Sequence, residues 1–250
     1  MDHVIYTAMG GASQSLEKQA ITANNLANAS TPGFKSQLAA LRAVPINGPT
    51  NHTRTLVVAS TPGADMSAGV MDYTGRSMDV ALPKESWLAV QTANGEAYTR
   101  NGNMELNADG QLTIQGRIVM GDGGPIEIPP NAQISISADG TISSLNAGDA
   151  PNTIAQLGRL KLVKATGQEV TRSDDGLFRL TPAAQQQRGN VLQNDPTVRI
   201  MPGVLEGSNV DSVGTLVDMI ANSRRFDMQM KVISSADTNA QSANQLLAIS

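Results

Sequence analysis

The sequence predicts a mainly β central domain, antiparallel and rich in hairpins, flanked by N- and C-terminal α-helices that pair as a coiled-coil stalk. Short runs of β-forming residues recur in the middle of the 250-residue chain, and glycine-containing turns separate them. Near both ends, apolar residues instead recur at steps of three and four, as in helices that bury one face. We therefore divide the chain into four segments. They are 1–29, 30–74, 75–204 and 205–250.

The first segment, residues 1–29, has the pattern of a helix that needs a partner. Seven positions follow alternating steps of four and three, which is the spacing of a coiled-coil seam. They are Ile5, Met9, Ala12, Leu16, Gln19, Ala23 and Leu26. Glycine inside a helix costs about 1 kcal/mol relative to alanine, so Gly10 and Gly11 make this helix marginal alone. The small seam residues indicate a partner that comes close. A helix packed on its own domain is the alternative.

The helix is expected to end in an asparagine-rich break. Asn24, Asn25 and Asn28 are poor helix formers, Pro32 cannot continue a helix, and Gly33 permits a turn. We interpret this stretch as a joint between the helix and a β-rich body. Two explanations of the asparagines stay open: they bind neighbouring helices, or they only let the helix end.

Residues 30–74 are expected to form an extended linker or arm. Prolines and glycines are spread through them, and a stretch this long without periodicity is unusual inside a compact domain. One short strand is predicted at Thr53–Ala59, where side chains alternate in type.

Residues 75–204 carry the signals of antiparallel β structure. Five turn dipeptides supply the positive φ that tight hairpins require. They are Asn94-Gly95, Asp109-Gly110, Asp122-Gly123, Asp139-Gly140 and Asp175-Gly176. The predicted strands are Met78–Leu82, Trp87–Thr92, Ala97–Arg100, Met104–Leu106, Gln111–Ile114, Ile118–Met120, Ile126–Ile128, Ile134–Ser137, Thr141–Ser144, Leu160–Lys164, Leu177–Leu180 and Thr197–Met201. Their order in a sheet does not follow from the sequence.

Residues 205–250 return to helix, with Asn209 or Asp211 as the expected cap. A helix of more than thirty residues is about 45 Å long, which exceeds most globular helices and favours a coiled coil. Its predicted seam is Val213, Val217, Ile220, Met230, Ile233, Ala240 and Leu247, with Phe226 adjacent.

Composition argues against most kinds of chemistry. The chain has no cysteine, 3% aromatic residues and a net charge of −4 without a basic stripe, so a thiol site and a nucleic-acid surface have no support. His3 and His52 are the only histidines and suit no catalytic arrangement. We predict no enzyme activity, cofactor or metal. We also expect no lipid-embedded segment and no cleavable signal peptide.

Three groups of residues resemble the flagellar rod and hook protein family. The first is Ala23-Asn24-Asn25-Leu26-Ala27-Asn28 followed by Thr31-Pro32-Gly33-Phe34-Lys35. The second is Leu216-Val217-Asp218-Met219-Ile220 with Arg225-Phe226-Asp227, Lys231-Val232-Ile233 and Asp237. The third is Gly75–Leu82, Tyr98–Gly102, Asp109-Gly110 and Gly124–Pro129. Pro83–Leu88 replaces the glycine-rich aromatic segment of distal rod and hook relatives, so the chain resembles the proximal rod members in particular.

The resemblance implies a structural, torque-transmitting subunit of the proximal rod of the bacterial flagellar basal body, located in the periplasm. It implies self-assembly through polymerisation helices at both ends, with the β-rich segment as an outer domain. The implied partners are other rod subunits, copies of itself and the flagellar type III export apparatus. The expected assembly residues are Leu16, Ala23, Asn24, Asn25, Leu26, Asn28, Thr31, Pro32, Gly33, Phe34, Lys35, Val213, Leu216, Val217, Ile220, Arg225, Phe226, Met230 and Ile233.

Two other functions fit parts of the pattern. A secreted β-rich adhesin or carbohydrate-binding module with a coiled-coil oligomerisation stalk is the main alternative. A cell-wall hydrolase is disfavoured, because no carboxylate pair or nucleophile stands out.

Overall fold

A computed structural model describes residues 2–45, 55–130, 132–146 and 154–247. The chain divides into two compact units. Unit 1 comprises Met1–Ala29, Gln37–Pro62 and Val210–Ser250, and unit 2 comprises Ser30–Ser36 and Gly63–Asn209. The chain therefore passes between the units four times. The four-segment division predicted from the sequence stays a prediction, because spatial compactness does not measure independent folding.

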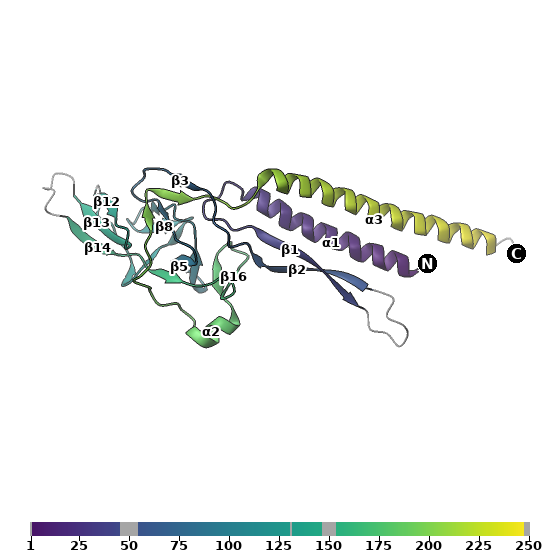
Figure 1. Ribbon diagram of the computed structural model, residues 1–250, viewed down its shortest axis with the longest axis horizontal. Helices are drawn as coiled ribbons and strands as arrows, with labels where there is room; N and C mark the ends of the chain where they lie inside the picture. The colour runs from purple at the N-terminus through teal and green to yellow at the C-terminus, as the bar shows by residue number, and fades with distance from the viewer. Residues whose placement is uncertain (1, 46–54, 131, 147–153, 248–250) are drawn as a thin grey trace. The chain divides into compact units, whose positions relative to one another are not determined.

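Unit 1 is built on two long helices, α1 (Asp2–Ala27) and α3 (Ser212–Leu247). They are antiparallel: Gly11 lies against Gln229, whereas Thr22 lies near Asn222. Figure 1 shows the two helices side by side, with the start of α1 and the end of α3 at the same end of the pair. Two strands, β1 (Gln37–Pro45) and β2 (Thr55–Ala64), pair in a two-stranded sheet.

These strands differ from the predicted linker. The 30–74 segment contains β1, which the sequence did not predict because its alanine-rich run has little β propensity and no alternation. The predicted strand at 53–59 lies within β2 from Thr55 onward, and its first two residues lie outside the described residues. His52 also lies outside them.

Of the two residues predicted to cap the start of α3, Asp211 does so. The amides of Val213 and Gly214 donate to the Asp211 carboxylate at 3.1 Å each, which satisfies two free N–H groups of the first turn. Asn209, the other candidate, belongs to unit 2 and has a different role described below.

The predicted seam of α1 was right at Ala12 but wrong at the large residues Met9 and Leu16. The buried side chains of α1 are Ala8, Ala12 and Thr22, whereas Met9 and Leu16 are 53% and 54% exposed. Small side chains let the helices approach closely, and a Cβ on Gly11 would lie 2.9 Å from the Gln229 amide nitrogen. Pattern alone cannot tell which apolar stripe faces the partner within the chain and which faces outward.

The seam of α3 needs the same correction. Val213, Val217, Ile220 and Met230 are exposed, and only Ile233 and Ala240 of the described seam positions are partly covered. The less exposed positions form another stripe, with alternating steps of three and four. They are Met219, Asn222, Phe226, Gln229, Ile233, Ala236, Ala240 and Ala243.

Unit 2 is a set of small antiparallel sheets. Its strands are β3 (Met71–Tyr73), β4 (Val80–Ala81), β5 (Ser86–Thr92), β6 (Gly95–Thr99), β7 (Glu105–Leu106), β8 (Leu112–Ile114), β9 (Arg117–Ile118), β10 (Met120–Gly121), β11 (Gly124–Pro125), β12 (Gln133–Ile136), β13 (Thr141–Leu145), β14 (Ala155–Arg159), β15 (Leu162–Lys164), β16 (Val170–Arg172), β17 (Phe178–Leu180), β18 (Met201–Pro202) and β19 (Val204–Glu206). A short helix, α2 (Pro182–Arg188), follows β17 and is capped by Thr181. The predicted antiparallel β class is confirmed.

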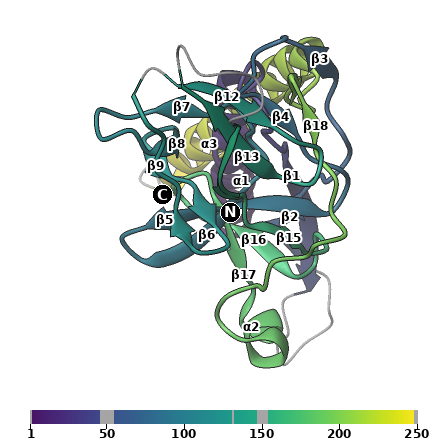
Figure 2. The ribbon, with the colours of Figure 1, turned by 90° about the vertical axis from the view of Figure 1, so that its left-hand side faces the viewer.

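The largest sheet has the order β15-β5-β6-β17-β16 and is visible in Figure 2. Both of its faces are buried. Leu88 and Val90 of β5 enter one apolar cluster, whereas Trp87 and Ala89 enter another on the opposite face. A sheet covered on both sides explains why β5 reads as an apolar run and not as an alternation.

All five predicted turn dipeptides lie between strands that are neighbours in the chain. Gly95, Gly110, Gly140 and Gly176 have positive φ, as hairpin turns demand. In the turn between β10 and β11, the residue with positive φ is Gly124 and not Gly123.

Candidate assembly interface

The two long helices expose an unusual amount of apolar surface. The large apolar side chains of α1 and α3 that are more than 40% exposed are Tyr6, Met9, Leu16, Val213, Leu216, Val217, Ile220, Met228, Met230 and Val232. Many large exposed apolar side chains on the same two helices indicate an interaction site. None of the described helices contains an apolar stretch long enough to span a bilayer.

Unit 1 has little apolar interior of its own. Among its described side chains, the buried apolar residues are Ala8, Ala12 and Ala236, and none is larger than alanine. Both apolar clusters of large side chains lie in unit 2. Burial contributes about 25 cal/mol per Å² of apolar area, so three alanines stabilise the helix pair only weakly. The helices would gain far more by burying their exposed stripes against another molecule.

A polar groove runs between the two helices of unit 1. It is lined by Gly11, Gln14, Ser15, Lys18, Asn222, Arg225, Met228 and Gln229. Arg225, an expected assembly residue, lines this groove together with Lys18. Phe226 is only partly exposed, since it belongs to the covered stripe of α3.

The asparagines that close α1 bind their own chain. The side-chain amide of Asn25 donates to the Gln37 carbonyl at 2.9 Å and accepts from the Gln37 amide at 2.8 Å, which joins α1 to the first residue of β1. The Asn28 side chain donates to the Asn24 carbonyl at 2.8 Å, and the same carbonyl accepts from the Asn28 backbone amide at 3.2 Å. Asn28 therefore fits the second explanation, that the asparagines let the helix end, whereas Asn25 joins α1 to β1, a role that neither explanation named. Leu26 is partly exposed, and Ala23 and Asn24 are exposed.

The loop after α1 turns into the interior of unit 2. Gly33 has a φ of 67°, and a Cβ there would lie 2.4 Å from the Arg100 carbonyl oxygen. Phe34 is 7% exposed, and the Arg172 guanidinium lies 4.2 Å from its ring centre. Lys35 is 1% exposed, while Thr31 and Pro32 are intermediate. Three expected assembly residues are therefore not on the surface of this structure.

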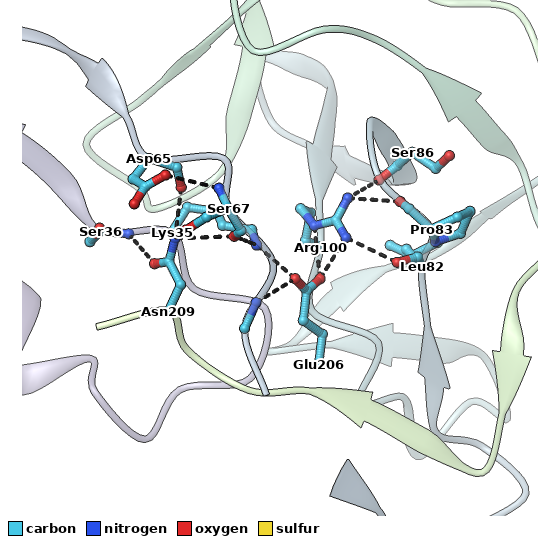
Figure 3. Close-up of polar contacts among 11 residues, drawn as sticks. Lys35, Ser36, Asp65, Ser67, Leu82, Pro83, Ser86, Arg100, Glu206 and Asn209 are labelled. Carbon is cyan, nitrogen blue, oxygen red and sulfur yellow. Dashed lines mark hydrogen bonds and ion pairs between the residues drawn. The ribbon is translucent and has the colours of Figure 1, made fainter. Parts of the chain in front are cut away.

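Lys35 takes part in a buried ion cluster with Glu206 and Arg100, which Figure 3 shows. The Lys35 Nζ donates to the Glu206 Oε1 at 2.6 Å and to the Ser67 carbonyl at 2.6 Å. The Arg100 Nε and Nη2 donate to the Glu206 Oε2 at 2.9 and 2.6 Å. The Glu206 side chain has no exposed area, and the two cations are 1% and 5% exposed.

Each of the three charged groups of the cluster is hydrogen-bonded, as buried charges must be. Arg100 also donates to the carbonyls of Leu82, Pro83 and Ser86, which line one side of it. The Gly69 amide adds a hydrogen bond to the Glu206 Oε1 at 3.1 Å. Glu206 thus accepts from three separate parts of the chain, and we call Lys35, Arg100 and Glu206 the ion lock.

The charges of the ion lock stabilise one another. Burial by itself raises the pKa of the Glu206 carboxyl, but the Arg100 charge and the Lys35 hydrogen bond outweigh it and hold that pKa below its ordinary value of 4.5. Burial lowers the pKa of the Lys35 ammonium, and Glu206 offsets this only in part.

Asn209 joins the same segments by hydrogen bonds beside the ion lock. Its side-chain oxygen accepts from the Ser36 amide at 2.8 Å, and its side-chain nitrogen donates to the Asp65 carbonyl at 2.8 Å. Its own amide donates to the Phe34 carbonyl at 3.3 Å. The sequence contains no sign of this role, because its partners lie more than 140 positions away along the chain.

Comparison with known proteins gives these features a family. The family described as Flagella basal body rod protein matches residues 5–35, and the Flagellar basal body rod FlgEFG protein C-terminal matches residues 201–246. The Flagellar hook protein FlgE/F/G D1 domain matches residues 83–144. The chain is 66% identical to the flagellar basal-body rod protein FlgF of Salmonella typhimurium, with 100% of both chains covered.

The chain belongs to the flagellar basal-body rod protein family. It is also 66% identical to FlgF of Escherichia coli over 100% of both chains, and 35% identical to FlgF of Buchnera aphidicola from Schizaphis graminum over 98% of both. The prediction of a non-enzymatic structural protein is confirmed by these relatives. As a rod protein, the chain assembles with other flagellar rod subunits in the basal body.

The three matched spans meet in the ion lock of this rod protein. Lys35 ends the N-terminal span, Arg100 lies in the middle span, and Glu206 lies in the C-terminal span. Arg100 stands within the Tyr98–Gly102 stretch that the sequence comparison singled out, whereas Glu206 was not among the predicted site residues. The sequence around a single glutamate does not indicate that its side chain is buried, because this depends on its two cationic partners.

Acid is expected to weaken unit 2 through Glu206. Because its pKa is lower in the folded chain than its ordinary value of 4.5, the unfolded chain binds the proton first, and stability is lost as the pH falls below that value. Urea unfolding followed by the fluorescence of Trp87, the one tryptophan, measures this slope. Glu206→Gln should reduce the slope between pH 5 and about pH 3. Equal slopes in the two proteins would contradict the assignment.

Proposed function

We propose that this rod protein is a subunit of the proximal rod that polymerises through the exposed apolar faces of α1 and α3. The observation that carries the proposal is the contrast between ten exposed large apolar side chains on these helices and an interior of alanines. A second subunit presenting the same helices offers the apolar area that the isolated pair lacks. Identical contacts repeated with a fixed rotation produce an open tube or filament.

Coiled-coil-like pairing of α1 with α3 is part of this proposal. It is supported by the steps of three and four between the covered positions of α3 from Met219 to Ala243. The large side chains on the opposite faces then point toward neighbouring subunits. Ordering a residue costs roughly 1–2 kcal/mol, so we expect the ends to become fully helical only when a rod end supplies burial.

The remaining parts of the proposal follow the family resemblance. The partners are other rod subunits and copies of this chain, and the subunit transmits torque through many repeated contacts. We place the rod section in the periplasm and propose export through the flagellar type III apparatus. Among the predicted assembly residues, Leu16, Val213, Leu216, Val217, Ile220 and Met230 act directly at the interface, because their side chains are exposed.

A charge on the exposed face of α3 tests the interface. Ile220 is 56% exposed, so Ile220→Asp should abolish incorporation into rods and motility, while the urea unfolding of the purified chain changes by less than about 0.5 kcal/mol. Burying an unpaired carboxylate at a subunit contact is what prevents assembly.

Ile154 provides a matched control in unit 2, since it is the same residue type with 60% exposure. Ile154→Asp should leave motility intact. The comparison is made in a bacterial strain that lacks its own copy of the subunit. A motile Ile220→Asp strain would count against the interface.

A further inference from the structure

Two members of the ion lock, Lys35 and Glu206, lie in unit 2 within a few residues of points at which the chain passes to unit 1. The four passages follow Ala29, Ser36, Pro62 and Asn209. Soon after the first, the Gly33 amide donates to the Glu206 backbone carbonyl at 2.6 Å. Just before the second lies Lys35, and soon after the third lie Ser67 and Gly69, which bond to Lys35 and Glu206. Every segment that connects the units therefore starts or ends in unit 2 close to Glu206. We call these parts of unit 2, residues 33–36, 65–69 and 206–209, the roots.

Glu206 supplies the negative charge for two buried cations. Without its carboxylate, the Lys35 ammonium would keep its hydrogen bond to the Ser67 carbonyl but lose its counter-charge. Burying an ammonium without a counter-charge is strongly unfavourable. The loop from Ser30 to Ser36 therefore cannot stay docked in unit 2 until residue 206, which lies 171 positions later in the chain, is in place.

We propose that Glu206 is a positioning residue for assembly. Together with Lys35 and Arg100, it holds in place the roots from which α1, β1, β2 and α3 continue. Only a chain that has folded as far as residue 206 then has α1 and α3 anchored for joining the rod. The proposal rests on assembly through these helices. A chain whose N-terminal helix is complete but whose C-terminal segment has not yet docked lacks this anchor, which disfavours premature polymerisation.

The geometry distinguishes this role from general stabilisation. Backbone amides of each root donate hydrogen bonds to another root. The Gly33 and Gly69 amides donate to Glu206, the Asp65 amide donates to Ser36, and the Asn209 amide donates to Phe34. The sheet core around β5 and β6 makes its own hydrogen bonds and its own apolar contacts. Loss of the ion lock should therefore break the hydrogen bonds between the roots, while those of the sheet core stay intact.

Hydrogen exchange on the full-length chain tests the local effect. In Lys35→Met and Glu206→Gln, the amides at 33–36, 65–69 and 206–209 should exchange at least about tenfold faster, while those of β5 and β6 change by less than about threefold. The matched control is Lys161→Met, which breaks the Lys161–Glu96 pair of unit 2, whose N···O distance is 2.7 Å. This control should leave the three root segments protected. Unchanged protection in Lys35→Met and Glu206→Gln would overturn the proposal.

Assembly must then depend on the anchored roots and not on overall stability. A core variant, Leu112→Ala, serves as a comparison at a temperature where its folded fraction equals that of Glu206→Gln. Rod incorporation by Glu206→Gln should be at least about tenfold lower than by this comparison. Equal incorporation would show that Glu206 only stabilises, and would overturn the positioning role.

A milder variant keeps the test valid if Glu206→Gln does not fold. Asn209→Ala removes the hydrogen bonds to Ser36 and Asp65 while the ion lock stays intact, and should open the same segments to a smaller extent. The outcome is independent of the interface test. If Ile220→Asp still assembles, the interface proposal fails, whereas the hydrogen-exchange result judges the ion lock alone.

Discussion

Replacing Gly33 with alanine is expected to lower the free energy of unfolding by about 3 kcal/mol or more. Two costs combine. The backbone has a φ of 67°, which a side chain disfavours, and the new Cβ would lie 2.4 Å from three backbone atoms of Arg100 and Asn101. Backbone cannot move aside as a flexible side chain can, so the loop must leave its site. Urea unfolding followed by circular dichroism gives the change.

Gly116 separates the two costs. Its φ of 76° is similar, but a Cβ there would meet nothing within 4 Å. Gly116→Ala should therefore cost only about 1 kcal/mol, the conformational part. If Gly33→Ala costs no more than Gly116→Ala, the close approach to Arg100 does not constrain the loop.

Replacing Arg100 with methionine is expected to cost about 3–5 kcal/mol. The guanidinium gives two hydrogen bonds to Glu206 and three to the carbonyls of Leu82, Pro83 and Ser86. Methionine can replace the apolar stem of arginine but has no donor, so the three carbonyls and the Glu206 carboxylate each lose hydrogen bonds. Arg100→Lys should recover only a fraction, because a single ammonium cannot replace the planar set of donors.

Arg179 is the control for this substitution. It also pairs with an acid through two hydrogen bonds, to Asp175, but the two side chains are 23% and 31% exposed. Arg179→Met should cost less than about 1 kcal/mol, as partly exposed pairs do. Similar losses for Arg100→Met and Arg179→Met would mean that burial does not strengthen the ion lock.

The two units divide the work of a rod subunit in a physically consistent way. Unit 2 has two apolar clusters of large side chains and a buried ion lock, so it is well packed internally. Among its described residues, unit 1 exposes large apolar side chains and buries no apolar side chain larger than alanine, so under our proposal it gains most from neighbours. Strong internal packing in one part and incomplete packing in the other is what a subunit requires if it is to stay folded and still polymerise.

Sequence patterns predicted the helices more accurately than their faces. The C-terminal helix was expected within 205–250, with its cap at Asn209 or Asp211, and it spans Ser212–Leu247. The N-terminal helix was expected at 1–29 and spans Asp2–Ala27. The faces were wrong because large apolar residues were assumed to lie inside. In this protein the inside of the helix pair is small, as at Ala8 and Ala12, and the large residues face outward.

The β-rich body shows the same division between local and distant causes. Turn dipeptides such as Asn94-Gly95 and Asp139-Gly140 act within a few residues, so they marked the hairpins correctly. Strand β19 went unpredicted because its partner β3 lies about 130 positions earlier in the chain. The local sequence of a three-residue strand is too short to predict such a pairing.

The sequence alone determined the fold class, the two terminal helices, the break after Asn28 and the family, because each depends on residues close together in the chain or on a recognisable pattern. Only the tertiary structure decided which helix faces stay exposed and that Lys35, Arg100 and Glu206 meet. Burial of a charge depends on partners that are 106 and 171 positions apart, and no local propensity encodes that distance.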